Sequence, residues 1–448
     1  MLERKKLAVS CLIFGMLIGF ILGGSRSAWG HAFDNYGFGS RAIAMGGAMV
    51  GFDDQYTAVY YNPAGMAFHE GKDLSVGASY LFTTPSLHIK GTGTTNPAAD
   101  RSDIASDQGV SLGMTTPLRS GKIARVITTG LGLYIPYPFV SSVIELKSYD
   151  PATPYFLQYE NRNRFLQATW ALSYKAWEKL SFAVGADILI HLNPLVLNVA
   201  LVNNTAQFNL DTKFPLDFAP TAGLQYRPAD WLSLGAAYHG KTQIKVSVQA
   251  NIYLVPGQDP ISIPISYRDA YKPQQVEMGF GLKPLKDLLV SGALTWVDFS
   301  DYVPPIGIVD LSEAQNSQLG SIINAFVGYI PVYNTLKFKD YWIPRLGIEY
   351  KVTPHLDARA GYFYRNSSVP PQKWNTSFID PATNGISAGI GITFSDPLDI
   401  VDNPIHVDFS SQGQFLQKVT VNKTDSAYQS YTAEGSCHLI TGTLGYYF

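Results

Sequence analysis

The sequence predicts an all-β protein: a transmembrane antiparallel β-barrel of about fourteen strands with an N-terminal hatch (plug) inside the lumen. The chain ends on a segment, 438–448, in which apolar residues alternate with small or polar ones, and this is the period of a strand. Beyond the N-terminal 30 residues no apolar run is long enough for a membrane helix. Tyrosine (27), phenylalanine (24) and glycine (40) are abundant, while charged residues make up only 15%.

The final strand itself favours a membrane barrel over a soluble sandwich. It ends in Tyr446, Tyr447 and Phe448, and such an apolar edge is an aggregation hazard unless it is paired. Closure of a barrel removes the edge. The terminal aromatic residue also resembles the C-terminal signal by which bacterial outer-membrane barrels are recognised for insertion.

The first 30 residues predict a cleaved signal peptide. Arg4, Lys5 and Lys6 precede the uncharged run 7–22, and small residues at 28–30 fit a signal peptidase site. A permanent membrane anchor is the alternative, but an apolar run of about 16 residues is short of the ~20 needed to span a bilayer. After cleavage Cys437 would be the only cysteine, which excludes an internal disulfide.

Strand-like alternation recurs throughout residues 73–448, which we assign to the barrel. Short turns rich in proline and aspartate alternate with long connections, as in bacterial barrels with short periplasmic turns and long external loops. The fourteen predicted strands centre on 75–82, 110–114, 127–135, 166–174, 182–188, 222–226, 232–238, 276–282, 288–296, 342–350, 356–364, 386–394, 405–409 and 438–448.

Residues 31–72 do not alternate. They are rich in glycine and small apolar residues, which indicates a compact irregular segment and not a strand or a long helix. A mobile tail is the alternative. Apolar side chains favour burial, so we predict a hatch in the lumen, with Phe33, Phe38, Met45 and Met49 among its buried residues.

Here the chain resembles a known family, the long-chain fatty acid transporter (FadL/OmpP1/TodX) family. The stretch 359–370 is similar to a strand of that family that runs into a loop rich in proline, although Ser368 stands where a proline is usual. The most specific match is the Asn-Pro-Ala element of the hatch. The matching hatch residues are Gly39, Ser40, Arg41, Ala42, Met45, Gly46, Gly47, Ala48, Asp53, Asp54, Asn62, Pro63, Ala64 and Gly65.

The resemblance implies passive uptake of hydrophobic molecules, above all long-chain fatty acids, across the bacterial outer membrane. It implies capture by external loops, a pocket beside the hatch, and lateral release through a kink in the third strand. Gly130 and Gly132 are candidates for that kink, before Pro136; ordinary strand glycines are the alternative. Asn62 is expected to tie the hatch to the wall.

Two long connections are unusually apolar, and in position they resemble the family's outer groove. Strand extensions above the membrane are the alternative interpretation. The outer-groove candidates are Leu195, Leu197, Val199, Leu201, Ile252 and Leu254.

Alternation also points several charged side chains into the lumen. Arg345, Lys351, Arg359 and Arg365 are candidate contacts for a fatty-acid carboxylate. The alternative is that they pair with lumen carboxylates, because unpaired buried charge is costly.

Other function classes find little support. A net charge of −2 gives no reason to expect nucleic acid as a partner. No catalytic or metal-binding motif appears, so we predict a non-enzyme without cofactors. Uptake of aromatic or alkane hydrocarbons and a general diffusion porin remain the alternatives. The expected partners are the hydrophobic cargo, outer-membrane lipid and lipopolysaccharide, and the barrel assembly machinery; the protein is predicted to be a monomer.

Overall fold

The structure is a computed structural model. It describes residues 32–69, 75–91, 104, 106–118, 126–137, 153–159, 166–190, 195–202, 205–212, 216–252, 261–304, 308–309, 336–395 and 404–447. The predicted signal peptide (1–30) and the predicted boundary at residue 72 lie outside the described residues.

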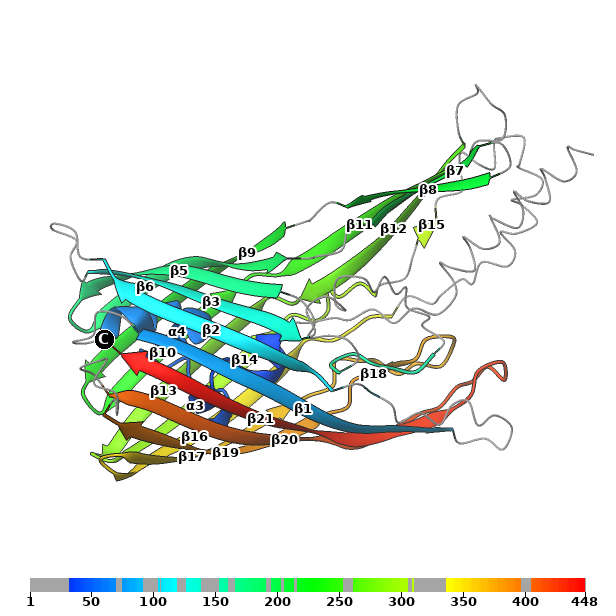
Figure 1. The fold of residues 1–448 in the computed structure, drawn as a ribbon. Helices are drawn as coiled ribbons and strands as arrows, with labels where there is room; N and C mark the ends of the chain where they lie inside the picture. The colour runs from blue at the N-terminus through cyan, green and yellow to red at the C-terminus, as the bar shows by residue number, and fades with distance from the viewer. Residues whose placement is uncertain are drawn as a thin grey trace, which may run out of the picture.

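Among the described residues, fourteen antiparallel strands close into one barrel, as predicted (Figure 1). Every predicted strand coincides with one of them. Around the ring they are β1 (Ser75–Gly91), β2 (Gln108–Pro117), β3 (Ile127–Tyr137), β5 (Leu166–Trp177), β6 (Leu180–Ile190), β9 (Leu216–Ala229), β10 (Leu232–His239), β13 (Gln275–Leu285), β14 (Leu288–Val297), β16 (Tyr341–Thr353), β17 (Leu356–Arg365), β19 (Thr383–Phe394), β20 (Ile405–Val421) and β21 (Tyr431–Tyr447).

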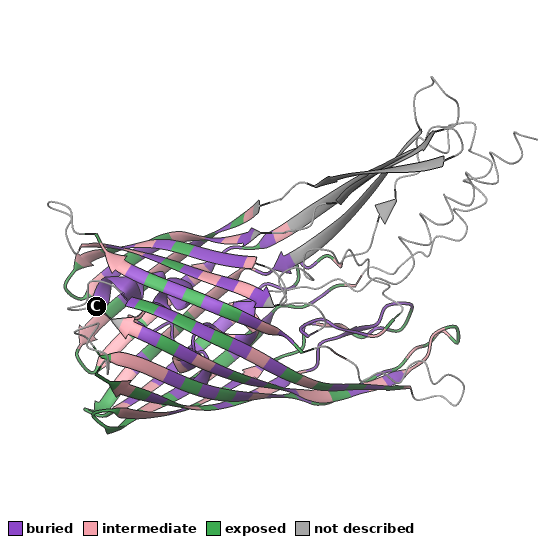
Figure 2. Ribbon diagram, viewed as in Figure 1, coloured by how far each residue is buried: buried purple, intermediate pink, exposed green. Residues whose placement is uncertain are grey.

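The apolar and polar residues that alternate in the sequence lie on the outer and inner faces of the barrel wall, respectively. Along β1, buried and exposed positions follow each other with period two, and Figure 2 shows the same banding over the ring. Large apolar side chains such as Val184, Ile386 and Leu444 are exposed on the outer face. Serine, threonine and glutamine side chains are buried on the inner face, as expected for a barrel with lipid outside and a polar lumen.

The first and last barrel strands close the ring over a long seam. β1 and β21 pair antiparallel without a register shift from Ser75 opposite Tyr447 to Gly91 opposite Tyr431. Both strands run beyond the ring at the end of the long connections (Figure 1).

The two apolar connections are strands, and this corrects their prediction as loops. β7 (Leu195–Val202) pairs with β8 (Thr205–Thr212), and β11 (Thr242–Ile252) with β12 (Ile261–Lys272) and β15 (Ile308–Val309). They extend away from the ring (Figure 1). Alternating apolar residues form strands wherever a partner is present, inside the membrane or beyond it. Leu254 and the side chains of the other outer-groove candidates lie outside the described residues, so the groove itself stays a prediction.

Two further connections fold over the lumen. β4 (Tyr155–Phe156) and β18 (Phe378–Ile379) form a short parallel pair. Their side chains alternate between two apolar clusters: Tyr155 and Phe378 join rings that include Tyr271 and Phe299, while Phe156 packs on the N-terminal residues. We call residues 153–159 with 368–380 the cap.

Residues 32–69, which we call the lumen segment, lie inside the ring. They form α2 (Ala32–Tyr36), α3 (Ser40–Ala44), α4 (Ala58–Tyr61) and the 3-10 helix η1 (Pro63–Phe68). Helix α3 contacts β17, β19, β20 and β21, whereas η1 contacts β3, β5, β6 and β9. The segment therefore reaches opposite sides of the wall. In the part of the chain that is described, no helix has the length and hydropathy to cross a membrane.

Candidate functional site

The Asn-Pro-Ala element ties the lumen segment to one side of the wall. The Asn62 amide donates from Nδ2 to the carbonyl oxygens of Val50 (2.8 Å) and Leu224 (3.0 Å) on β9, and its Oδ1 accepts from Ala64 N (3.2 Å). Ser181 on β6 donates to the Ala64 carbonyl (2.7 Å). Asn62 is fully buried, so these bonds replace those it would make to water.

The residue types around this element have steric reasons. Pro63 starts the 3-10 helix, where its fixed φ and missing N–H carry no penalty. At Gly65 an added Cβ would lie 1.9 Å from the carbonyl oxygen of Asp53. The turn therefore fits only with glycine at that position.

An ionic contact ties the segment to the opposite side. The Arg41 guanidinium binds both carboxylate oxygens of Glu349 on β16, each at 2.8 Å. Each ion also has a partner on its own side: Asp53 Oδ1 lies 3.9 Å from Arg41 Nη1, and Arg359 Nε donates to Glu349 at 2.6 Å. Arg359 also pairs with Asp408 on β20. The result is a chain of alternating charges from the segment across three wall strands.

Between these ties the segment follows the inner faces of β16, β17 and β19. Gly46 has φ +65°, and its carbonyl accepts from Arg345 Nη1 (3.1 Å). An added Cβ at Gly347 would lie 2.7 Å from the Met45 carbonyl oxygen, and one at Gly361 would lie 2.1 Å from Gly46 N. We call residues 41–47 in this contact the septum. Backbone approaches the wall here because the glycines leave no side chain between them.

The predicted apolar hatch residues are buried. Phe33 is 2% exposed, and Phe38, Met45 and Met49 are 0% exposed. They belong to one apolar cluster that extends to Phe156 of the cap.

A row of four glycines on adjacent strands makes room for the hatch rings. Gly445, Gly77, Gly113 and Gly132 stand opposite one another on β21, β1, β2 and β3. The ring of Phe38 lies within 3.3 Å of an added Cβ at Gly113 or Gly132.

The predicted kink at Gly130 and Gly132 is absent from this structure. β3 pairs with β2 and β5 through both positions without a register shift. An added Cβ at Gly130 would lie 2.3 Å from Met66 Sδ. These glycines thus serve close approach of the lumen segment.

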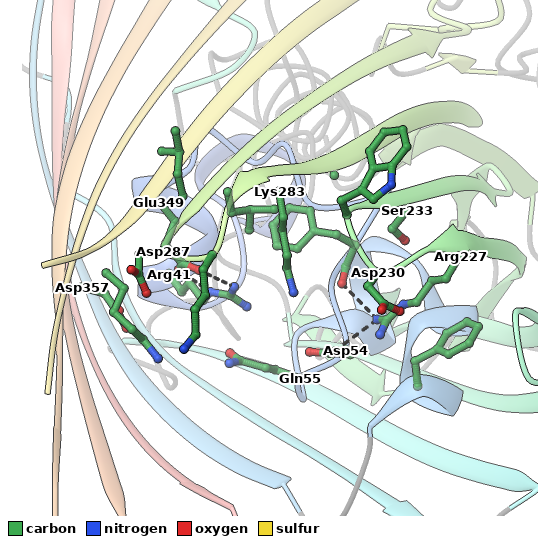
Figure 3. Close-up of a pocket in the computed structure, with 18 of the residues that line it drawn as sticks. Arg41, Asp54, Gln55, Arg227, Asp230, Ser233, Lys283, Asp287, Glu349 and Asp357 are labelled. Carbon is green, nitrogen blue, oxygen red and sulfur yellow. Dashed lines mark hydrogen bonds and ion pairs between the residues drawn. The ribbon is translucent and has the colours of Figure 1, made fainter. Parts of the chain in front are cut away.

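A large polar space opens at the short-turn end of the barrel. This vestibule has a volume of about 1080 Å³ and is lined by Arg41, Glu349 and residues of the turns between neighbouring strands. Figure 3 shows Arg41 beside Glu349 and, on another side, Arg227 beside Asp54. The second ion pair spans 3.2 Å. Cations and carboxylates are interspersed along the whole lining, so the vestibule has mixed charge.

A small pocket lies on the other side of the lumen segment. It has a volume of about 60 Å³. Its lining combines apolar residues (Phe33, Ile43, Phe363) with Arg345 and Glu277. Arg345 and Glu349 are inward-facing residues of the same strand, β16. Arg345 borders this inner pocket and Glu349 the vestibule, so the septum separates the two spaces.

The four predicted carboxylate contacts do not lie together. Arg359 is ion-paired beside the vestibule, and Arg365 pairs with Asp380 of the cap at 3.0 Å. For these two residues the alternative interpretation, pairing with carboxylates of the protein, is the one observed. Lys351 is exposed in the vestibule. Arg345 faces the inner pocket, and its Nε has no hydrogen-bond partner among the described residues.

A buried ionic cluster near α4 was not predicted. Asp187 on β6 is paired with Lys272 and with His239 Nδ1 (3.1 Å), and both Asp187 and Lys272 are 0% exposed. The Lys272 ammonium stands 5.8 Å from the ring centroid of Tyr60 on α4. Asp187 lies at an inward position of β6, but its partners come from other strands and no sequence signal identifies them.

Asp53 illustrates the electrostatics of the segment. Burial raises the pKa of its carboxyl to about 6, against the opposing effects of Arg41 and of the Thr57 hydroxyl, which donates to it at 2.6 Å. Removal from water disfavours the anion, and these partners offset the effect only in part.

A closed antiparallel barrel with an apolar outer wall and a charged, filled lumen defines the class of outer-membrane β-barrel proteins. Within that class, residues 21–448 match the model of the family described as outer membrane protein transport protein (OMPP1/FadL/TodX), and the chain belongs to this family. It is therefore an outer-membrane transport protein.

Individual relatives are more distant. Alkane uptake protein A of Marinobacter nauticus is 23% identical, over 94% of this chain and 92% of that protein. A crystal structure of a Pseudomonas aeruginosa FadL homologue has a TM-score of 0.60 at 17% identity, covering 94% of this chain and 99% of the other. The P. putida toluene transporter TodX has a TM-score of 0.55 at 16% identity, covering 93% and 99%. These two structures support the fold.

Proposed function

We propose that the protein takes up hydrophobic compounds passively across the outer membrane, with long-chain fatty acids as the first candidate cargo. The observation that carries this proposal is the arrangement of the lumen. The apolar cluster that joins the lumen segment to Phe156 of the cap adjoins an inner pocket with two arginines in its lining. Arg365 is paired with Asp380, whereas Arg345 has an unused Nε donor. The pocket, of about 60 Å³, has room for a head group, and a guanidinium suits a carboxylate. The neighbouring apolar cluster suits an alkyl chain.

Neutral hydrocarbons are the second candidate. Relatives are named for alkane uptake and for toluene transport. Two of the four predicted cations, Arg359 and Arg365, are already paired with carboxylates, so little lumen charge is left for an acidic cargo. The choice therefore depends on Arg345.

Release through the barrel wall remains part of the proposal. Apolar area transferred through water costs about 25 cal/mol per Å², and the charged vestibule offers cargo no apolar route. The glycine row across β21, β1, β2 and β3 favours this part of the wall as the place where it gives way. We also propose export by a cleaved signal peptide and insertion as a monomer by the barrel assembly machinery.

Uptake by cells lacking their own transporter tests the cargo. Cells with and without the protein receive labelled oleate, hexadecane or toluene. For a fatty-acid transporter, Arg345→Met should reduce oleate uptake and leave hexadecane uptake unchanged. Lys351→Met, a cation of the vestibule, is the matched control and should change neither. Uptake of hydrocarbons alone would select the second candidate; no uptake together with steady ion conductance in a planar bilayer would indicate a porin.

A further inference from the structure

The two ties of the lumen segment differ in what their rupture costs. Asn62 is fully buried, and separating it from β9 would leave the carbonyl oxygen of Leu224 without this donor, which is costly because no water replaces it. The tie on β6 and β9 is therefore a fixed attachment.

Arg41 and Glu349 are in a different position. Their side chains are 14% and 16% exposed and border the vestibule, so water reaches them when they separate. Each ion also keeps a partner on its own side, Asp53 for Arg41 and Arg359 for Glu349. Neither charge is left alone, and this avoids the large penalty of a broken buried ion pair.

What the pair holds in place is the septum. Residues 41–47 stand between the inner pocket and the vestibule, and the inner wall behind them carries Arg345, Gly347 and Glu349 in succession along β16. Inward positions on a strand are about 6.6 Å apart. A movement of the septum by about this distance along β16 would therefore carry it past one inward residue of the wall.

We propose that the Arg41–Glu349 pair is the releasable tie of the lumen segment, and that its release joins the inner pocket to the vestibule along β16 and β17. Asn62 then acts as the hinge on the other side. The route goes beyond the proposed lateral release, which serves apolar cargo, and the alternating charges of its lining suit ions and polar solutes. Arg41 and Glu349 are positioning residues for the segment.

The test is ion conductance in planar bilayers with potassium chloride alone, so it does not depend on the cargo. Glu349→Gln and Arg41→Met each remove one charge at near-constant shape and should raise conductance several-fold over the parent. The double variant should conduct like the single ones, because both break the same contact. Arg41→Lys retains a charge without the bidentate fork and should fall in between.

Asp54→Asn is the matched control, since the Asp54–Arg227 pair also joins segment and wall beside the vestibule but does not border the inner pocket. It should conduct like the parent. Retained folded mobility on an unheated gel shows that each barrel is intact. Parent-like conductance of folded Glu349→Gln, or equal conductance of Asp54→Asn and Glu349→Gln, would overturn the proposal. If the variants show the expected conductances but the parent protein takes up no labelled oleate, the proposed cargo is rejected and the releasable tie stands.

Discussion

The ammonium group of Lys272 donates to the Asp187 carboxylate inside the barrel, although Lys272 ends a strand, β12, that extends beyond the ring (Figure 1). His239, at the end of β10 where the chain leaves the wall, meets the same oxygen. The outer strands β11 and β12 are thus both anchored, where they join the ring, to one buried carboxylate next to α4.

Replacing Lys272 by methionine should destabilise the barrel. Asp187 would keep only its contact with His239 Nδ1, and removing one partner of a buried ion pair costs about 3–5 kcal/mol. The measurement is the urea concentration at half-unfolding, followed by tryptophan fluorescence. Lys272→Met combined with Asp187→Leu removes both charges and should recover most of the loss; a double variant as unstable as the single one would show that the charge is not the cause.

Asn62→Ala should loosen the lumen segment without unfolding the barrel. The change removes the two hydrogen bonds that Asn62 donates and the one that it accepts, each worth about 1 kcal/mol. Amide hydrogen exchange should accelerate in residues 50–65 and stay slow in β13 and β14. Ser181→Ala, which removes a single bond to the same turn, should have a smaller effect in the same residues. Equal acceleration in the wall strands would contradict a local role.

Gly46→Ala should push the septum off the wall. An added Cβ would stand 2.8 Å from Tyr362 N, at a φ of +65° that side chains disfavour by roughly 1–2 kcal/mol. Faster exchange of residues 41–47 and a rise in ion conductance are expected. Gly442→Ala is the control, because its Cβ would make an ordinary 3.4 Å contact with Phe409. Hydrogen exchange and conductance of Gly46→Ala equal to those of the parent protein would mean that the septum packs on β17 less closely than the structure shows.

Docking of the segment should weaken as the pH rises through about 6. Asp53 has a pKa of about 6 when buried and 3.8 ordinarily, so the docked state binds the proton more tightly. The stabilisation is complete below pH ~4 and lost above ~6, on the order of 3 kcal/mol in all. Hydrogen exchange of residues 49–61 at pH 5 and pH 7, corrected for intrinsic rates, measures it. Asp53→Asn stays neutral and should abolish the difference; a pH dependence that survives in this variant would belong to another group.

The wall could be predicted from the sequence because one physical rule governs it. Lipid outside and polar lumen inside force period two on every spanning strand, so segments such as 182–188 and 386–394 could be placed from alternation alone. The rule was not extended to Leu195–Val202 and Thr242–Ile252, which were predicted as loops and are strands. Strands can continue beyond the membrane, and nothing in the residues marks where the hydrocarbon ends.

The site was only partly predictable. Residues of the hatch could be named from the resemblance, and alternation turned Glu349 and Arg359 inward. Their partners could not be predicted, because Arg41 meets Glu349 across 308 positions of sequence and such a pairing depends on how the segment sits in the ring. The kink at Gly130 was wrong for a related reason: a glycine that weakens a strand and one that admits Met66 look alike in sequence.

The seam between β1 and β21 bears on how the molecule is made. Ser40 of the lumen segment is hydrogen-bonded to the Thr443 hydroxyl at 2.7 Å, and Thr443 to Ser79 of β1, so the first, second and last parts of the described chain meet at one point. Pairing residues so distant in sequence carries a high loop-closure entropy and comes late in folding. If the segment is seated before the last strand docks, its hydroxyl contacts give that strand a template on the inner side. Assembly would then proceed around its own plug, with closure of the ring as the final step.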